Sequence, residues 1–184
     1  MTRNKVFNAL KYEFQAEEPI LIDANVCLYL LPPPGQSTSP WTADYSAAFK
    51  RLLAAKAAPV TDAIIISEYL NRYFRLEYEA GWKSQYATFK KFRVSGDFKN
   101  LAEDAIDEAG QILKHSAIQN TPLKDLDLNA ILTETKAGTL DFNDAVIVES
   151  CRHHGWKLLT NDGDCCLGGI EVLTTAPELL SRCR

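Results

Sequence analysis

The first candidates for chemistry are acidic residues that stand beside apolar segments. Asp23 follows the apolar run Pro19–Ile22, and Asn25 comes two residues later. Burying a carboxylate and an amide is costly unless each finds a partner. In a parallel α/β sheet, ligands bind beyond the carboxyl ends of the strands, so Asp23 indicates a ligand site. Capping of the following helix explains Asp23 equally well.

Two further segments carry acids at a helix. Glu68 lies in the mostly apolar stretch IIISEYLNRYF, where Arg72 offers a surface ion pair as the alternative role. Asp141 and Asp144, in LDFND, have the spacing of a capping box. The residues after Asp144 are apolar, which places it close to the core. Asp141 as a cap and Asp144 as a ligand are compatible roles.

A second strand end carries Asp162 and Asp164, directly after the apolar segment WKLLT. An ordinary turn explains Asp162 and Gly163, but it does not explain the second acid. Carboxylates gathered in one cleft repel one another, and a hard divalent cation such as Mg²⁺ or Mn²⁺ relieves that repulsion. The combination of these acids therefore predicts a site for Mg²⁺ or Mn²⁺.

The elements that must position these acids are short apolar strands alternating with helices. This pattern predicts an α/β fold of three layers, α/β/α, that is rich in helix and has a short central parallel sheet. We expect residues 1–18 to form an arm or an amphipathic helix. Residues 19–184 should form the main domain, with an enlarged helical region at about 40–120.

Composition restricts the class of protein. The chain has 184 residues, 46% hydrophobic and 24% charged, as is usual for a soluble domain. A net charge of −4 argues against tight, sequence-independent adhesion to nucleic acid. The sequence shows no apolar run long enough to span a membrane and no secretory signal, so a cytoplasmic protein is expected. The five cysteines show no zinc-binding spacing, so we expect them to be small hydrophobic residues in a reducing compartment, where disulfides are rare.

Three segments in order, LIDANV, ISEYLNRY and LDFNDAVIVESCRHHGWKLLTNDGD, resemble the PIN-domain nucleases. The resemblance is strongest to VapC-like toxins of type II toxin–antitoxin pairs, and it spans about residues 19–175. It implies a PIN-like fold and metal-dependent hydrolysis of RNA. Cys165 departs from the aromatic residue that the family often has after its last acid.

The resemblance also assigns roles to residues. The catalytic acids that it implies are Asp23, Glu68, Asp144 and Asp162, with Asp164 as an additional ligand of Mg²⁺ or Mn²⁺. Asn25 and Thr160 match supporting polar residues, and Asp141 supports the helix start. The implied partners are an RNA substrate and a cognate antitoxin, and a homodimer remains open.

Basic residues that would follow the RNA backbone stand among the aromatic residues Tyr86, Phe89 and Phe92. They are Arg72, Arg75, Lys83, Lys90, Lys91 and Arg93, although a solvated helix face explains each one singly. Three other hypotheses stay open. The chain could be a haloacid-dehalogenase-like phosphatase, although Asn25 stands where that family has an Asp. It could be a catalytically silent PIN-fold binding module, or an α/β domain whose acids are all caps and turns.

Overall fold

The computed structural model describes residues 2–36 and 39–183, which are organised around one parallel β-sheet. The strand order is β1-β6-β5-β2-β3-β4, and each neighbouring pair is parallel. The carboxyl ends of the strands therefore lie at one edge of the sheet. The strands are β1 (Lys5–Asn8), β2 (Pro19–Ile22), β3 (Ala58–Thr61), β4 (Ala117–Ile118), β5 (Lys157–Leu159) and β6 (Glu171–Thr174).

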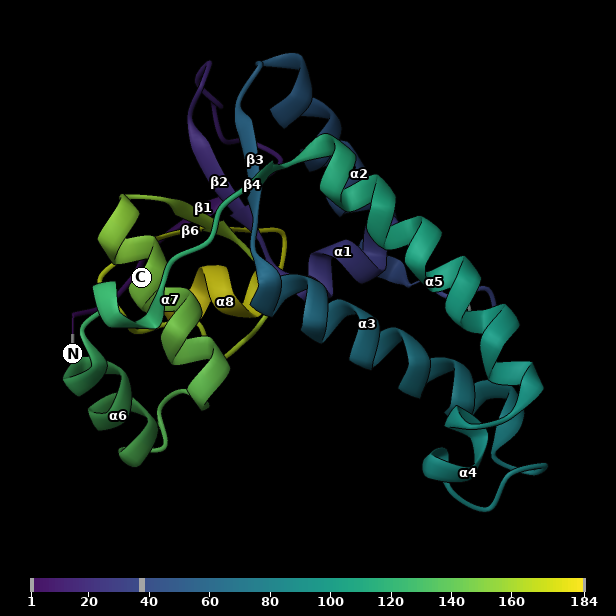
Figure 1. Ribbon diagram of the computed structural model, residues 1–184. Coiled ribbons are helices and arrows are strands. Elements are labelled where there is room, and N and C mark those ends of the chain that lie inside the picture. Colours follow the sequence, from purple (N-terminus) through teal and green to yellow (C-terminus); the bar gives the residue numbers. More distant parts are fainter. Residues whose placement is uncertain (1, 37–38, 184) are drawn as a thin grey trace.

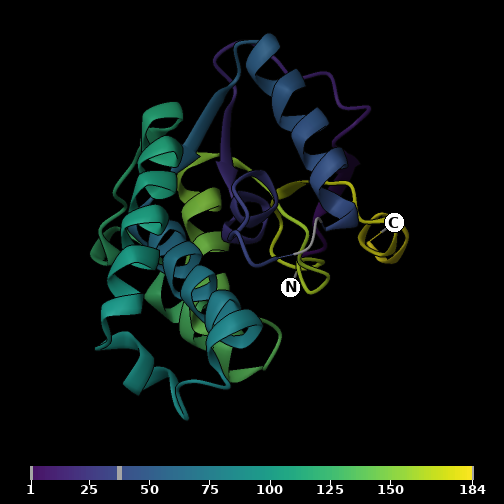
Figure 2. The same cartoon turned by 90° about the vertical axis from the view of Figure 1, so that its right-hand side faces the viewer.

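Helices cover both faces of this sheet (Figure 1). Helices α2, α3 and α5 lie on one side of the strands, with α3 and α5 side by side (Figure 2), and α6 and α7 lie on the other side (Figure 1). This arrangement confirms the predicted three-layer α/β/α class. No helix in the part of the chain that the structure describes is long and apolar enough to cross a membrane. The helices are α1 (Ala24–Leu30), α2 (Pro40–Ala54), α3 (Ala63–Glu77), α4 (Phe89–Arg93), α5 (Gly96–His115), α6 (Leu128–Lys136), α7 (Phe142–His154) and α8 (Pro177–Arg182).

Strand β2 is the centre of the core. Its residues Ile20, Leu21 and Ile22 are at most 2% exposed. Leu21 pairs with Val60 of β3 on one side and with Leu158 of β5 on the other. A parallel strand that is covered on both faces reads as a continuous apolar run, which is how β2 appears in the sequence. The polar residues that follow β2 and β5 are consequently brought to neighbouring positions.

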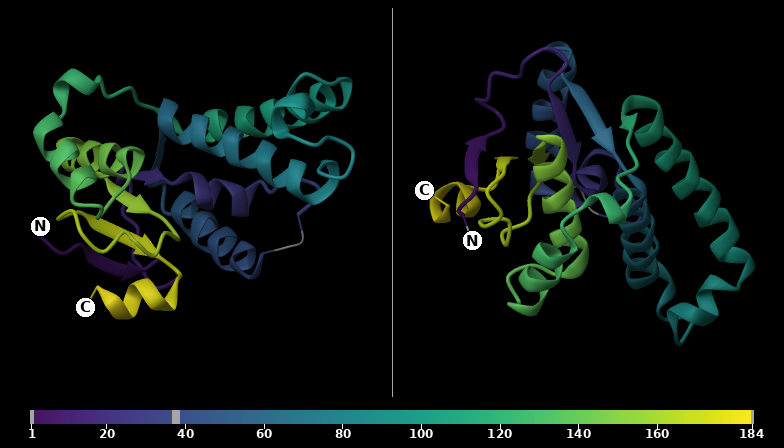
Figure 3. Two further views of the ribbon diagram at one scale, coloured as in Figure 1. Left: turned by 90° about the horizontal axis from the view of Figure 1, so that it is seen from below. Right: turned by 60° about the vertical axis from the view of Figure 1, so that its left-hand side comes forward.

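The region of residues 40–120 contains a long helical projection (Figure 3). Helix α3 continues into a π-helical turn, Tyr78–Trp82, and α5 returns toward the sheet after α4. The far end of this projection has its own small aromatic core. Phe92 is fully buried there and stacks on Trp82 with ring centroids 5.4 Å apart.

The amino-terminal segment differs from the prediction. An arm or amphipathic helix was expected in residues 1–18, but residues Lys5–Asn8 form strand β1 at the edge of the sheet. Val6 pairs with Val172 of β6, and the Asn4 side chain binds the carbonyls of Cys165 and Leu167, each at 3.1 Å. Pairing with β6 outweighs the helical spacing of the segment, because tertiary contacts override local propensity.

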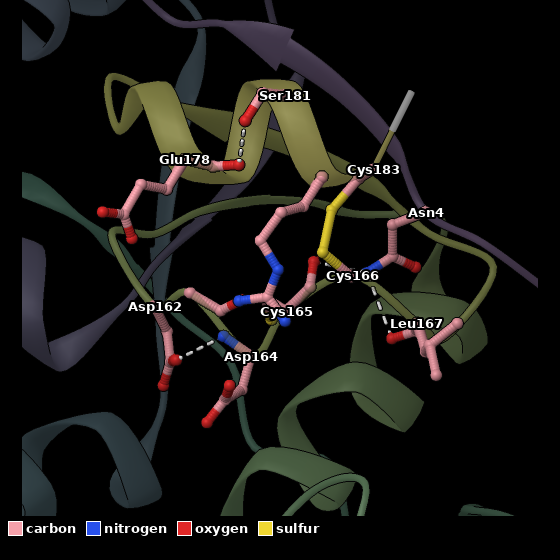
Figure 4. The surroundings of a disulfide bond; sticks show 11 residues. Asn4, Asp162, Asp164, Cys165, Cys166, Leu167, Glu178, Ser181 and Cys183 are labelled. Carbon is pink, nitrogen blue, oxygen red and sulfur yellow. Dashed lines mark hydrogen bonds between the residues drawn. A yellow bond between two sulfur atoms is a disulfide. The ribbon is translucent and has the colours of Figure 1, made fainter.

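The prediction that the cysteines form no disulfide is also wrong. Cys166 and Cys183 are joined, with 17 residues of sequence separation and Cα atoms 5.4 Å apart. The bond ties α8 to the loop that carries Asp162 and Asp164 (Figure 4). Cys27, Cys151 and Cys165 are free and buried, as expected of small apolar residues. The fold brings Cys183 back to this loop, and sequence spacing alone could not reveal that.

Candidate active site

Asp23 stands before α1, but its hydrogen-bonding partners are polar side chains. It occupies the N-cap position of α1 but makes no side-chain capping hydrogen bond. Its Oδ2 instead accepts hydrogen bonds from Asn25 Nδ2, at 2.7 Å, and from the Thr160 hydroxyl. Asp23 and Asn25 are 8% and 7% exposed. The capping explanation for Asp23 therefore fails, and the side chain is held as part of a polar network.

This network joins the ends of β2 and β5. The backbone N–H of Asn161 donates to Asn25 Oδ1 at 3.1 Å. The N–H of Asp162 donates to Thr160 Oγ1 at 2.9 Å. Each polar atom that these strand ends bury thus has a partner, which removes the main penalty of burying it. The network holds Asp23 and Asp162 in a defined relative position.

Helix α7 presents a third acid to the same place. Asp141 caps α7 by accepting from the N–H of Asp144 at 2.9 Å. Asp144 lies in the first turn, and its own carboxylate is left for other partners. The two predicted roles, a cap and a ligand, are compatible with this geometry.

Electrostatics show which acids lie close to one another. Burial raises the pKa of Asp144 to about 7, and the charges of Asp141, Asp162, Asp23 and Glu68 raise it further. Burial likewise raises the pKa of Asp23 to about 6, with Glu68 and Asp162 adding to the effect and the Thr160 hydrogen bond opposing it. The acids predicted from four separate segments therefore form one negatively charged cluster.

Glu68 belongs to this cluster and also makes the predicted surface pair. Its carboxylate lies 3.4 Å from Arg72 one turn further along α3. Half of the Arg72 side chain is exposed, so the pair is weak. Glu68 can exchange this partner for another at little cost.

Asp164 stands apart from the other acids. It is exposed, and the acids that most raise the pKa of Asp23 and of Asp144 are others. Its backbone N–H donates to Asp162 Oδ1 at 2.9 Å, as the dashed line in Figure 4 shows. The backbone at Asp164 thus orients the Asp162 carboxylate, without the Asp164 side chain.

The donor set of the cluster suits a hard divalent cation. Carboxylate oxygens are the ligands that Mg²⁺ and Mn²⁺ prefer, and a cation would offset the repulsion that raises the two pKa values. In residues 2–36 and 39–183, no three His, Cys, Asp or Glu side chains are gathered into a ready metal-binding group as they now stand. The residue types and the charge fit the ion, and side-chain rotation would have to bring the oxygens together.

The predicted basic residues do not form one strip. Arg72 lies beside the acids through Glu68, whereas Lys90, Lys91 and Arg93 lie on α4 at the far end of the helical projection (Figure 1). Arg75 lies over the ring of Phe89, 5.2 Å from its centroid. Lys83 pairs with Glu79 at 2.6 Å.

The aromatic residues between these cations pack against one another, and one of them is fully buried. Phe92 is fully buried, and Tyr86 and Phe89 pack around it in the small core at the tip. The expectation that all three interleave with basic charge on a binding surface is therefore wrong for Phe92. Phe92 lies between basic residues in the sequence because it fills the core at the tip of the projection, where the neighbouring cations stay at the surface.

Two residues near the site were missed by the sequence reasoning. The Tyr45 hydroxyl lies 2.9 Å from the Thr160 carbonyl and 2.9 Å from Asn161 Oδ1, so it supports the turn after β5. Asp62 follows β3 in the way that Asp23 follows β2, but it caps α3 by accepting from Ile65 N–H at 2.9 Å. The apolar run before Asp62 was a usable signal, whereas nothing in the sequence linked Tyr45 to residue 160.

The fold and the site together define a parallel α/β protein with an acidic cluster at the carboxyl edge of its sheet. The PIN domain family profile matches residues 20–167, which is most of the chain. The chain therefore belongs to the PIN domain family. A comparison with curated proteins gave no match.

Solved structures share this fold at low sequence identity. VapBC2 from Rickettsia felis, solved bound to a DNA fragment from its promoter, is 15% identical over 84% of this chain and 98% of that chain, with a TM-score of 0.53. FitAcB from Neisseria gonorrhoeae is 15% identical over 84% of this chain and 96% of that chain, with a TM-score of 0.50. At this identity the comparisons support the fold alone.

Proposed function

We propose that this protein is a metal-dependent ribonuclease that hydrolyses phosphodiester bonds in RNA. The observation that carries the proposal is the mutual effect of Asp23, Glu68, Asp144 and Asp162 on the pKa values of Asp23 and Asp144. These acids come from α3, α7 and two strand ends, so a purely local role such as capping does not explain their convergence. Membership of the PIN domain family supports the same activity.

In this proposal the four acids hold Mg²⁺ or Mn²⁺, directly or through water, and Asp164 assists. A bound divalent ion would lower the pKa of a water molecule and offset negative charge on the phosphate. Hydrogen bonds within the chain hold the acidic side chains in position. Asn25 and Thr160 fix Asp23, Asp164 N–H fixes Asp162, and the cap at Asp141 fixes the start of α7.

Arg72 is the basic residue best placed to contact the substrate. Its exposed guanidinium lies beside Glu68, and it can leave that weak pair for a phosphate, which arginine binds with two parallel hydrogen bonds. Arg75, Lys90, Lys91 and Arg93 would contact only a longer RNA that reaches the tip of the projection.

We further propose that a cognate antitoxin inhibits this activity. VapBC2 and FitAcB share the fold, and VapBC2 was solved as an assembly on promoter DNA. A protein that covers the acidic edge of the sheet would block both metal and substrate. Co-purification would test for the antitoxin, and analytical ultracentrifugation would test whether the chain also forms a homodimer.

The deciding experiment measures cleavage of labelled single-stranded RNA with Mg²⁺ or Mn²⁺, with and without chelator. Asp144→Asn should reduce cleavage by a factor of 100 or more, on the order of the loss seen when a catalytic group is removed. The matched control is Asp107→Asn, because Asp107 is exposed on α5 and away from the cluster. Calorimetry with Mn²⁺ should show binding that Asp144→Asn weakens.

Two outcomes would contradict the proposal. One is the absence of cleavage together with the absence of Mn²⁺ binding, which would leave a silent PIN-fold binding module. The other is cleavage that persists in chelator or in Asp144→Asn, which would place the chemistry elsewhere.

A further inference from the structure

A small cavity adjoins the acidic cluster. It has a volume of about 200 Å³ and lies between α1, the start of α2 and α3. Two of its lining residues touch the cluster directly, since Asn25 binds Asp23 at 2.7 Å and Arg72 pairs with Glu68 at 3.4 Å. A group seated in this cavity would therefore lie next to a phosphate that reaches the acids.

The wall of the cavity combines apolar side chains with one aromatic ring. Leu28, Pro32 and Leu76 supply the apolar part. The ring of Tyr29 is stacked on Tyr45 with centroids 5.5 Å apart, and its hydroxyl accepts from Asn161 Nδ2 at 3.1 Å. Such a wall suits a flat, partly apolar group.

The cavity is held in shape by the loop that follows α1. The Leu31 carbonyl accepts from the Tyr69 hydroxyl at 3.0 Å. The Gly35 N–H donates to the buried Glu77 carboxylate at 2.6 Å. A Cβ at Gly35 would lie 2.7 Å from Glu77 Oε1, so a larger residue there would displace this carboxylate from its hydrogen bond. A preformed wall binds with less loss of conformational entropy than a mobile one.

One residue of the cavity wall carries a polar atom that has no partner within the protein. Thr42 lines the cavity, and its Oγ1 is buried without a hydrogen bond. Solvent does not reach this hydroxyl as it now stands, so rotation of the Thr42 side chain would be needed to present it to a bound molecule. Buried hydroxyl groups are nearly always satisfied, and such a rotation would give this one a partner. In the described residues, the other buried side-chain atoms without a partner are Thr61 Oγ1, Glu134 Oε2 and Thr175 Oγ1, and their residues do not line this cavity.

We propose that this cavity binds the unstacked base that flanks the scissile phosphate of a single-stranded RNA. The proposal rests on the proposed ribonuclease function and names a subsite for it. The volume is below the roughly 300–1,000 Å³ of sites for drug-sized ligands, which fits one base and not a whole nucleotide. Proteins read single-stranded RNA by splaying bases out and by contacting their faces and edges.

Within this subsite, Thr42 Oγ1 contacts the edge of the base and Tyr29 contributes to the wall. Arg72 at the rim binds the adjoining phosphate. The hydroxyl of Thr42 donates or accepts, so it discriminates among bases together with the shape of the cavity. Thr42 is thus a specificity-determining residue, distinct from the acids that carry the reaction.

The test separates base binding from cleavage. Each nucleoside 5′-monophosphate is titrated into the metal-free protein in chelator, and binding is followed by NMR. We expect at least one to bind, with shifted signals from α1, Thr42 and Arg72. Thr42→Val, which keeps the shape and removes the hydroxyl, should weaken that binding by about tenfold.

The matched control is Thr175→Val, which also removes a buried hydroxyl without a partner, but away from the cavity. Sequencing of RNA fragments should show that Thr42→Val relaxes the base preference beside the cut, whereas Thr175→Val keeps it. Absence of nucleotide binding, or equal behaviour of the two variants, in a protein that still cleaves RNA would overturn the subsite. Absence of cleavage by the wild type would instead reject the ribonuclease.

Discussion

The disulfide between Cys166 and Cys183 gives a stability prediction with a calculable magnitude. Helix α8 is short and buries only part of its surface, with Leu179 as its buried residue and the buried Cys183 directly after it. The disulfide and the bond from Arg182 to the Gly163 carbonyl, at 3.3 Å, connect its end to the loop of Asp162 and Asp164. Cutting the disulfide therefore tests how this loop is held.

The magnitude follows from the length of chain that the bond closes. Its ends are separated by 17 residues. The chain-entropy relation for a loop of that length gives about 3 kcal/mol at 25 °C, because the bond restricts the unfolded chain. That is a large part of the 5–15 kcal/mol by which an ordinary domain is stable.

The assay is equilibrium unfolding in guanidinium chloride, for the wild type and for Cys166→Ser/Cys183→Ser, each with and without reductant. Reductant should lower the free energy of unfolding of the wild type by about 3 kcal/mol and leave the double variant unchanged. The denatured wild type should show three free thiols before reduction, from Cys27, Cys151 and Cys165. Hydrogen exchange at the Asp164 amide should accelerate when the bond is cut. Equal stability with and without reductant, or five thiols before reduction, would refute the reasoning.

Two further predictions concern charge. Burial raises the pKa of Asp23 to about 6 and that of Asp144 to about 7, so the folded state binds protons more tightly than the unfolded state, where these groups have ordinary values near 3.8. These groups therefore stabilise the metal-free protein most at low pH, and the contribution is lost as pH rises from about 4 through 7. Asp144→Asn should consequently be more stable than the wild type by about 1–2 kcal/mol at pH 8, after allowance for solvent screening, and nearly equal at pH 4, by urea unfolding. A constant difference across this range would show that the charge of Asp144 is not responsible. Arg152 pairs with Glu134 at 2.6 Å and with Glu149 at 2.7 Å, and it also donates to the Gly168 carbonyl. Arg152→Met should cost about 3 kcal/mol in thermal unfolding because both glutamates are largely buried, whereas Arg72→Met, from an exposed pair, should cost under about 1 kcal/mol. Similar losses in the two variants would contradict this difference in burial.

Much of the acidic site could be predicted because its residues carry local signals. Asp23 and Asp162 each follow an apolar run, and the carboxyl ends of parallel strands meet at one edge of a sheet. Asp141 and Asp144 carry the spacing of a helix cap. These signals depend on a few neighbouring residues, so the sequence alone determined the α/β class, most helix starts and the acids that converge.

The tertiary structure alone decided which distant groups meet. It paired Cys166 with Cys183 and drew Lys5–Asn8 into the sheet. It separated Arg72, beside the acids, from Lys90 at the tip of the projection. It also left Thr42 Oγ1 without a partner in a cavity beside the site. Such contacts depend on how several helices pack at once, and a one-dimensional pattern records only the preferences of each segment.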